Sequence, residues 1–178
     1  SDDILHKRKL ETHIKCLNES PQCQSAWSPL QRFKNIEEDT LSCDTIDIEI
    51  LISKAYILEK DENLFRPEYL PSAALHRREV FKKTGPWNEK LKRWQDLEYQ
   101  VRMIKNVDKF VVIDSPFYFF RQHDGIRINS MYSSINGLKP GLTSLGEVEV
   151  QIGENNNPIV LKVLANMYLS LLYISAKY

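Results

Sequence analysis

The sequence has little cysteine and no excess of charge of either sign. Three cysteines occur in 178 residues, Cys16, Cys23 and Cys43, and their spacing matches neither a zinc site nor a disulfide framework. This usage is typical of a reducing compartment, so we expect a cytoplasmic protein, in solution or at the inner face of the membrane. Lys plus Arg and Asp plus Glu each number 24. Without a basic excess we expect no nucleic-acid partner.

Long apolar runs and common catalytic signatures are also absent from the sequence. The most apolar stretch, residues 159–174, is shorter than the ~20 residues of a membrane-spanning helix and carries Lys162 and Asn166. No Gly-x-Ser-x-Gly, Gly-x-x-x-x-Gly-Lys or His-Glu-x-x-His occurs, so a hydrolase of that type, a P-loop enzyme and a zinc peptidase lack support. What is present, 42% hydrophobic and 27% charged residues, is typical of a globular domain with a sizeable core.

The spacing of apolar residues predicts an α/β fold, with segments of helical and of strand character along the chain. We expect Asp44 to cap the second helix, Gly85 to end the third, and Asp96 to open the fourth. The expected helices cover residues 7–18, 44–59, 78–84, a segment from 96 onward, and 159–176. The expected strands cover residues 72–75, 109–114, 117–120 and 147–152.

The region around Asp96 carries the clearest functional pattern. A strand of small residues runs into a helix over residues 71–84, and a Gly-Pro-Trp-Asn-Glu turn begins at Gly85. Gln95-Asp96 then opens a helix, Arg102 follows six residues later, and an aromatic strand leads into Arg121-Gln122-His123. In this order the motifs resemble the second half of the catalytic domain of family 2 glycosyltransferases, the inverting sugar transferases with a GT-A fold.

The resemblance covers residues 1–130 and implies a partial GT-A fold, a mixed sheet with flanking helices. Residues 131–178 are then an extension that ends in an amphipathic helix. We expect this helix to pack on its own domain, with a homodimer contact or contact with a membrane surface as the alternatives. Because Lys9-Leu10-Glu11 stands where the family has the helix after its Asp-x-Asp motif, we expect the chain to begin inside that motif. We therefore expect a piece of a longer protein, without the half that grips the nucleotide base.

The resemblance also implies a metal-assisted reaction with a nucleotide-diphosphate sugar as donor and a glycan or lipid-linked acceptor. A departing diphosphate needs a divalent cation, and hard oxygen ligands suit Mn²⁺ or Mg²⁺. By analogy with the family, Asp2, Asp3 and His123 are the expected metal ligands. Donor binding is expected to involve Asp2 and Asp3 again, together with Arg102 and Arg121. Capping of the following helix is the alternative role for the two aspartates.

Asp96 corresponds to the family's catalytic base. Inverting transfer is an in-line displacement at the anomeric carbon, and a positioned carboxylate can take the proton of the attacking hydroxyl. At a helix N-terminus the helix dipole favours the ionised form of such a carboxylate. Plain helix capping is the alternative for Asp96, an i,i+4 ion pair with Glu98 is the alternative for Arg102, and Trp94 is expected either as a sugar-stacking wall or in the core.

Gln95 departs from the family pattern, which has Glu before the catalytic Asp. Any role that needs a second negative charge is therefore in doubt. A catalytically degenerate module of the same fold, which binds sugar or protein without chemistry, is the alternative function. The resemblance places the parent enzyme in bacterial polysaccharide synthesis, and we expect this chain alone to lack transferase activity.

Overall fold

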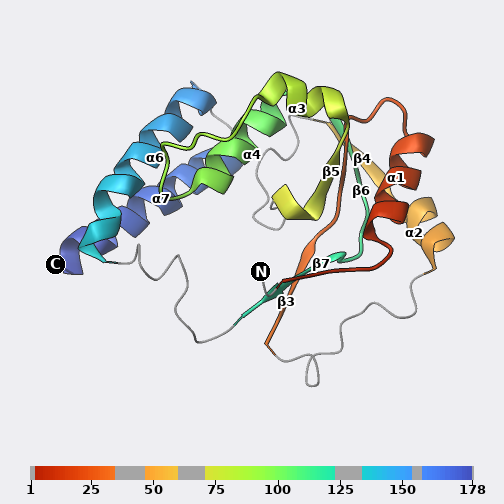
Figure 1. The fold of residues 1–178 in the computed structure, drawn as a ribbon, viewed down its shortest axis with the longest axis horizontal. Helices are drawn as coiled ribbons and strands as arrows, with labels where there is room; N and C mark the ends of the chain where they lie inside the picture. Colours follow the sequence, from red (N-terminus) through yellow and green to blue (C-terminus); the bar gives the residue numbers. More distant parts are fainter. Residues whose placement is uncertain (1–2, 35–46, 60–70, 123–133, 154–157, 178) are drawn as a thin grey trace.

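The structure, a computed structural model, describes residues 3–34, 47–59, 71–122, 134–153 and 158–177 (Figure 1). Its helices are α1 (Lys9–Glu19), α2 (Ile48–Lys54), α3 (Arg78–Thr84), α4 (Gln95–Lys105), α6 (Leu138–Ile152) and α7 (Pro158–Lys177), with the 3-10 turns η1 (Pro71–Ala73) and η2 (Ile135–Gly137). Its strands are β1 (Ile4–Leu5), β2 (Ser25–Trp27), β3 (Leu30–Phe33), β4 (Tyr56–Glu59), β5 (Ala74–His76), β6 (Lys109–Val112) and β7 (Tyr118–Arg121). Within these ranges, no helix has both the length and the hydropathy that crossing a membrane requires.

A four-stranded mixed sheet forms the centre of the fold. Its strand order is β4-β6-β2-β5, with β2 and β6 parallel and the two outer strands antiparallel to their neighbours. Because successive side chains of a strand point to opposite faces, each central strand contributes to two cores. Ala26 and Val111 pack in the core that α1 covers, whereas Trp27, Phe110 and Val112 pack in the other.

Helices cover both faces of this sheet, which gives three layers (Figure 1). On one side α1 contributes Cys16 and Leu17 to the smaller core. On the other side α4, α6 and α7 pack together and share the larger core with the sheet. The buried residues that these three helices contribute are Tyr99, Val101, Met103, Ile104, Leu145, Val148, Met167 and Leu171. The α/β fold with flanking helices expected from the sequence is confirmed.

A second sheet of three strands has the order β1-β7-β3. It extends the parallel pair of the central sheet, because β3 follows β2 and β7 follows β6 along the chain, and β3 and β7 are again parallel. Strand β1 is antiparallel to β7, with Ile4 opposite Phe119. This pairing holds the first described residues beside the end of β7.

Two secondary-structure predictions are wrong. The helix expected over residues 44–59 is only Ile48–Lys54, with Asp47 as its cap, and residues 56–59 form β4, which pairs with β6; Asp44 lies outside the described residues. Tyr56 and Ile57 are of the aromatic and β-branched types that favour strands, and the neighbouring edge of β6 is available for pairing. The strand expected over 147–152 is the end of α6, because Leu145 and Val148 meet the α4–α7 core at helical spacing.

Of the strand expected over residues 72–75, residues 72–73 lie in η1, and β5 begins at Ala74. No strand was expected at β2 or β3. The other expected helices and strands match the structure to within a few residues. Residues 7–18 correspond to α1 and residues 78–84 to α3, which ends at Gly85 with φ 77°, a conformation that glycine adopts without strain. The apolar stripe expected on the last helix is buried at Met167, Leu171 and Ile174. Packing of this helix on its own chain is confirmed.

Candidate active site

Asp96 lies in the first turn of α4, and its side chain is exposed. The preceding Trp94 has φ 53° and ψ 27°, a left-handed conformation that is uncommon for a bulky residue. This turn is held in place because the Arg93 carbonyl accepts a hydrogen bond from Ser144 Oγ and the Arg93 guanidinium donates to the Gly137 carbonyl. Within the described residues, the Asp96 carboxylate accepts one hydrogen bond, from its neighbour Leu97 N at 2.9 Å. It is therefore open to a ligand.

Arg102 forms the ion pair that was the alternative to donor binding. Its Nε and NH2 atoms lie 2.5 and 3.0 Å from the two carboxylate oxygens of Glu98, and NH1 donates to the Thr84 carbonyl at 2.7 Å. Glu98 is 1% exposed and Arg102 is partly exposed, so the pair is buried on its acidic side. We call Glu98 and Arg102 the α4 ion pair. It joins α4 to the end of α3, and the predicted i,i+4 pair is confirmed.

Asp3 lies at the start of β1 and contacts β7. Its carboxylate accepts hydrogen bonds from Tyr118 Oη at 2.7 Å and from the backbone N of Arg121 at 3.1 Å. The fold thus brings two of the expected ligand-binding residues together, Asp3 and Arg121.

The expected metal ligands Asp2 and His123 lie outside the described residues. In the part of the chain that is described, no three His, Cys, Asp or Glu side chains gather in a group that could hold a metal ion. The chemistry of Asp3 is compatible with such a role, because a carboxylate is a hard oxygen ligand of the kind that Mn²⁺ and Mg²⁺ prefer. Carboxylates with an imidazole form a donor set that suits Mn²⁺.

The aromatic residues of the turn between α3 and α4 take two different positions. Trp94 packs against the larger core, and the Arg93 guanidinium carbon lies 4.0 Å from the centre of its ring, so the core position is the one observed. Trp87 is 45% exposed, and its ring stacks on that of Tyr99 with centroids 4.3 Å apart and an angle of 9° between the planes. The sequence identified this turn as a motif but gave no sign of the stacking.

A second set of buried polar groups joins α1 to the strand region. Lys9 is 4% exposed, and its Nζ donates to the Ala73 carbonyl at 2.8 Å and lies 3.4 Å from His13 Nε2. His13 Nδ1 is 2.8 Å from the Lys9 carbonyl, and Ser28 Oγ lies 3.2 Å from both His13 Nε2 and the Ala73 carbonyl. We call Lys9, His13, Ser28 and the Ala73 carbonyl the α1 network.

The α1 network has unusual protonation. Burial lowers the pKa of Lys9 to about 8. Burial, with the Lys9 charge acting in the same direction, lowers the pKa of His13 to about 3. Since His13 Nδ1 faces a carbonyl, it carries the proton of the neutral ring. Among the described residues, no carboxylate pairs with Lys9. The buried ammonium group of Lys9 is therefore surrounded by uncharged partners, the Ala73 carbonyl and the His13 ring.

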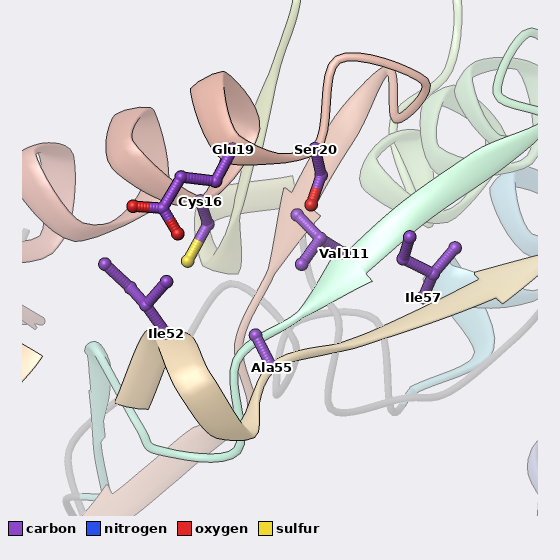
Figure 2. Close-up of a pocket in the computed structure, with 7 residues that line it drawn as sticks. All are labelled: Cys16, Glu19, Ser20, Ile52, Ala55, Ile57 and Val111. Atoms are coloured by element: carbon purple, nitrogen blue, oxygen red, sulfur yellow. The ribbon is translucent and has the colours of Figure 1, made fainter. Parts of the chain in front are cut away.

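A pocket of about 170 Å³ opens between α1, α2 and the central sheet (Figure 2). Its lining residues are Cys16, Glu19, Ser20, Ile52, Ala55, Ile57 and Val111. Of the candidate site residues that the structure describes, none lines this pocket. Burial and the nearby Glu19 raise the pKa of the Cys16 thiol to about 11, so the thiol stays protonated at neutral pH and is a poor nucleophile. We therefore do not place the reaction in this pocket.

Comparison with known proteins identifies a similar fold. No family model and no curated protein matches the sequence. Among solved structures, the chain is similar to residues 1–349 of TarS from S. aureus in complex with UDP-GlcNAc, with a TM-score of 0.57 and 13% sequence identity. The match covers 95% of this chain and 46% of the TarS chain, so this chain spans less than half of that structure. The likeness supports a glycosyltransferase-like α/β fold.

Proposed function

We propose that this chain forms the acceptor-side part of a metal-assisted, inverting glycosyltransferase of family 2 that uses a nucleotide-diphosphate sugar. The carrying observation is the fold likeness over 95% of the chain to TarS, crystallised with UDP-GlcNAc, which is such a sugar. The motif order around Asp96 supports the same function. A glycan or lipid-linked hydroxyl is the proposed acceptor.

In the proposed reaction Asp96 acts as the general base. The acceptor hydroxyl gives its proton to the Asp96 carboxylate while its oxygen bonds to the anomeric carbon. The bond from that carbon to the diphosphate oxygen breaks on the opposite side, and the nucleoside diphosphate leaves with the electron pair. The exposure of Asp96 in the first turn of α4 supports this role, because a base needs access to the substrate.

Asp2, Asp3 and His123 are the residues proposed to hold Mn²⁺ or Mg²⁺. When bound, the cation would offset the negative charge on the leaving diphosphate. The contact of Asp3 with the backbone of Arg121 supports this set, since His123 follows two residues later. Arg121 itself is exposed and is proposed to contact the donor. Donor contact by Arg102 would require it to rearrange from the α4 ion pair.

A catalytically degenerate module that binds sugar or protein is the second candidate function. Gln95 favours it, because the family's acidic residue before the catalytic Asp is missing. The exposed apolar side chains of α7, among them Leu172 and Tyr173, are proposed as a homodimer contact that fits either function. A monomer in sedimentation experiments at high concentration would contradict that contact.

Release of UDP from UDP-GlcNAc in the presence of Mn²⁺ tests the proposed function, with a simple sugar acceptor added. It is measured for this chain and for the longer natural polypeptide, if its gene encodes one. We expect turnover in the polypeptide that holds both halves of the domain and none in this chain alone. Asp96→Asn should reduce turnover by on the order of 10²- to 10⁴-fold. The control Asp114→Asn alters another exposed aspartate, outside the proposed site. Unchanged turnover in Asp96→Asn would exclude this residue as the base.

A further inference from the structure

Trp87 is a solvent-exposed aromatic residue whose ring is held in position by stacking on Tyr99. The indole is 45% exposed although it stacks in near-parallel fashion on Tyr99. Large aromatic side chains usually bury most of their area, because that burial stabilises the fold. A ring with one face on Tyr99 and much of its surface in solvent is suited to receive a flat apolar ligand surface.

The platform is preorganised by its supports. Tyr99 is 5% exposed, and the Arg102 guanidinium carbon lies 5.0 Å from the centre of its ring, so the α4 ion pair fixes Tyr99. The turn that carries Trp87 is anchored after it by Leu91, which is 2% exposed. A side chain already held in its binding position loses little conformational entropy when a ligand binds.

The platform lies next to Asp96. Tyr99 follows Asp96 by three residues in α4, and side chains at i and i+3 are neighbours on a helix surface. Helical side chains lean toward the N-terminus of the helix, so the Tyr99 ring extends toward the turn that holds Asp96. Trp87 is therefore stacked on a residue of the same helix that begins at the proposed base.

The chemistry of this place fits a sugar ring. A pyranose has a face of C–H bonds that packs on aromatic rings and a rim of hydroxyls that needs polar partners. An aromatic plane beside an open carboxylate offers both. The other two tryptophans do not, because Trp27 is 3% exposed and Trp94 packs on the core beneath Arg93.

We propose that Trp87, supported by Tyr99, is the stacking platform of the acceptor-sugar subsite. A pyranose lying on the indole has its rim directed to Asp96, which orients one hydroxyl for deprotonation. This inference rests on the proposed function for its assignment to the acceptor rather than the donor. Binding of a sugar at Trp87 is measurable without turnover.

The test follows the Trp87 indole N–H signal by NMR in this chain during titration with methyl glycosides of N-acetylglucosamine, glucose and galactose. UMP is titrated in parallel as a nucleotide probe. We expect a saturable shift of the Trp87 signal with at least one glycoside and none with UMP. No shift with any glycoside at high millimolar concentration, or a shift with UMP alone, would overturn the proposal.

Variants separate stacking from folding. Trp87→Leu should weaken glycoside binding by at least about tenfold, and Trp87→Phe should retain most of it, because a smaller aromatic plane remains. For these variants binding is followed by the signals of the Asp96 and Tyr99 backbone amides. Tyr173→Leu is the control, since it removes another exposed aromatic ring, on α7. Equal binding by wild type and Trp87→Leu would rule out the platform.

The outcomes separate this inference from the proposed function. If Asp96→Asn leaves turnover intact while Trp87→Leu abolishes glycoside binding, the base assignment fails and the sugar subsite stands. If Asp96→Asn abolishes turnover while Trp87→Leu binds normally, the transferase stands and the subsite fails.

Discussion

The α4 ion pair and the α1 network are both buried and polar, yet they handle charge in opposite ways. Glu98 and Arg102 neutralise each other, with the Thr84 carbonyl taking a further hydrogen bond. Lys9, by contrast, is held by a carbonyl and lies beside the neutral ring of His13. Removing ions from water is costly unless each is paired and hydrogen-bonded. The α4 ion pair thus balances its charges within itself, whereas burial lowers the pKa of both Lys9 and His13 in the α1 network.

This difference indicates which parts of the fold are affected when each of the two sites is altered. The α4 ion pair supports Tyr99 and joins the turn of Asp96 to α3, so its loss reaches the candidate active site. The α1 network joins α1 to the Ala73 carbonyl, next to β5, so its titration acts on the strand region. Variants of the α4 ion pair and variants of the α1 network should therefore change the stability of the protein in different ways, those of the α1 network in a pH-dependent way.

Breaking the α4 ion pair should have the largest effect. Glu98→Gln removes the negative charge and leaves Arg102 without a counter-charge in a buried place, so we expect a loss of about 3 kcal/mol in the free energy of unfolding. Urea unfolding followed by circular dichroism measures it. Glu11→Gln is the matched control, because Glu11 pairs with Arg8 in an exposed i,i+3 geometry. That change should leave the free energy of unfolding almost unchanged, because an exposed ion pair contributes little to stability. Equal losses in the two variants would contradict the comparison.

Acid should act on the α1 network next most strongly. His13 is neutral in the fold because its pKa is lowered to about 3, whereas its unfolded value is 6.5. The unfolded chain therefore binds more protons below pH 6.5, and stability falls as pH drops from there toward 3. We expect this residue to account for a loss on the order of 3 kcal/mol between pH 7 and pH 4. In His13→Gln the decline should be shallower, and parallel pH curves for the two proteins would refute the assignment.

Lys9→Met should have the smallest effect at neutral pH. It removes a buried charge that pairs with no carboxylate among the described residues, so we expect a change within about 1 kcal/mol. The pKa of Lys9 is lowered to about 8, so between pH 8 and 10.5 the unfolded chain binds more protons and stability rises with pH. Lys9→Met should lack this rise, whereas the exposed control Lys7→Met should keep it. A strongly destabilised Lys9→Met at pH 7 would show that the ammonium has a needed partner.

Parts of the candidate site were predictable from local pattern. The Asp96 position in the first turn of a helix follows from the polar turn before it and from Leu97, Val101 and Ile104 after it. The Glu98–Arg102 pair follows from i,i+4 spacing. The contact of Asp3 with Arg121 was not predictable, because β1 and β7 pair across more than a hundred residues.

The errors in the fold have the same origin. Residues 56–59 have apolar spacing compatible with a helix, but the open edge of β6 offers hydrogen bonds that only a strand can make. Residues 147–152 alternate in polarity like a strand, yet they continue α6 because α4 and α7 provide a core for one helical face. A weak local preference yields to such tertiary contacts.

The sequence by itself determined the α/β class, the helix that Asp96 begins, and the motif order that resembles a sugar transferase, because each depends on residues close together in the chain. Only the tertiary structure decided that Trp87 stacks on Tyr99 with much of its ring exposed, that Lys9 is buried without a described carboxylate partner, and that Trp94 packs on the core. These outcomes depend on which distant surfaces meet. Tertiary contacts, rather than local spacing, determine how deeply a side chain is buried. Burial in turn determines the pKa of the side chain and its access to a ligand.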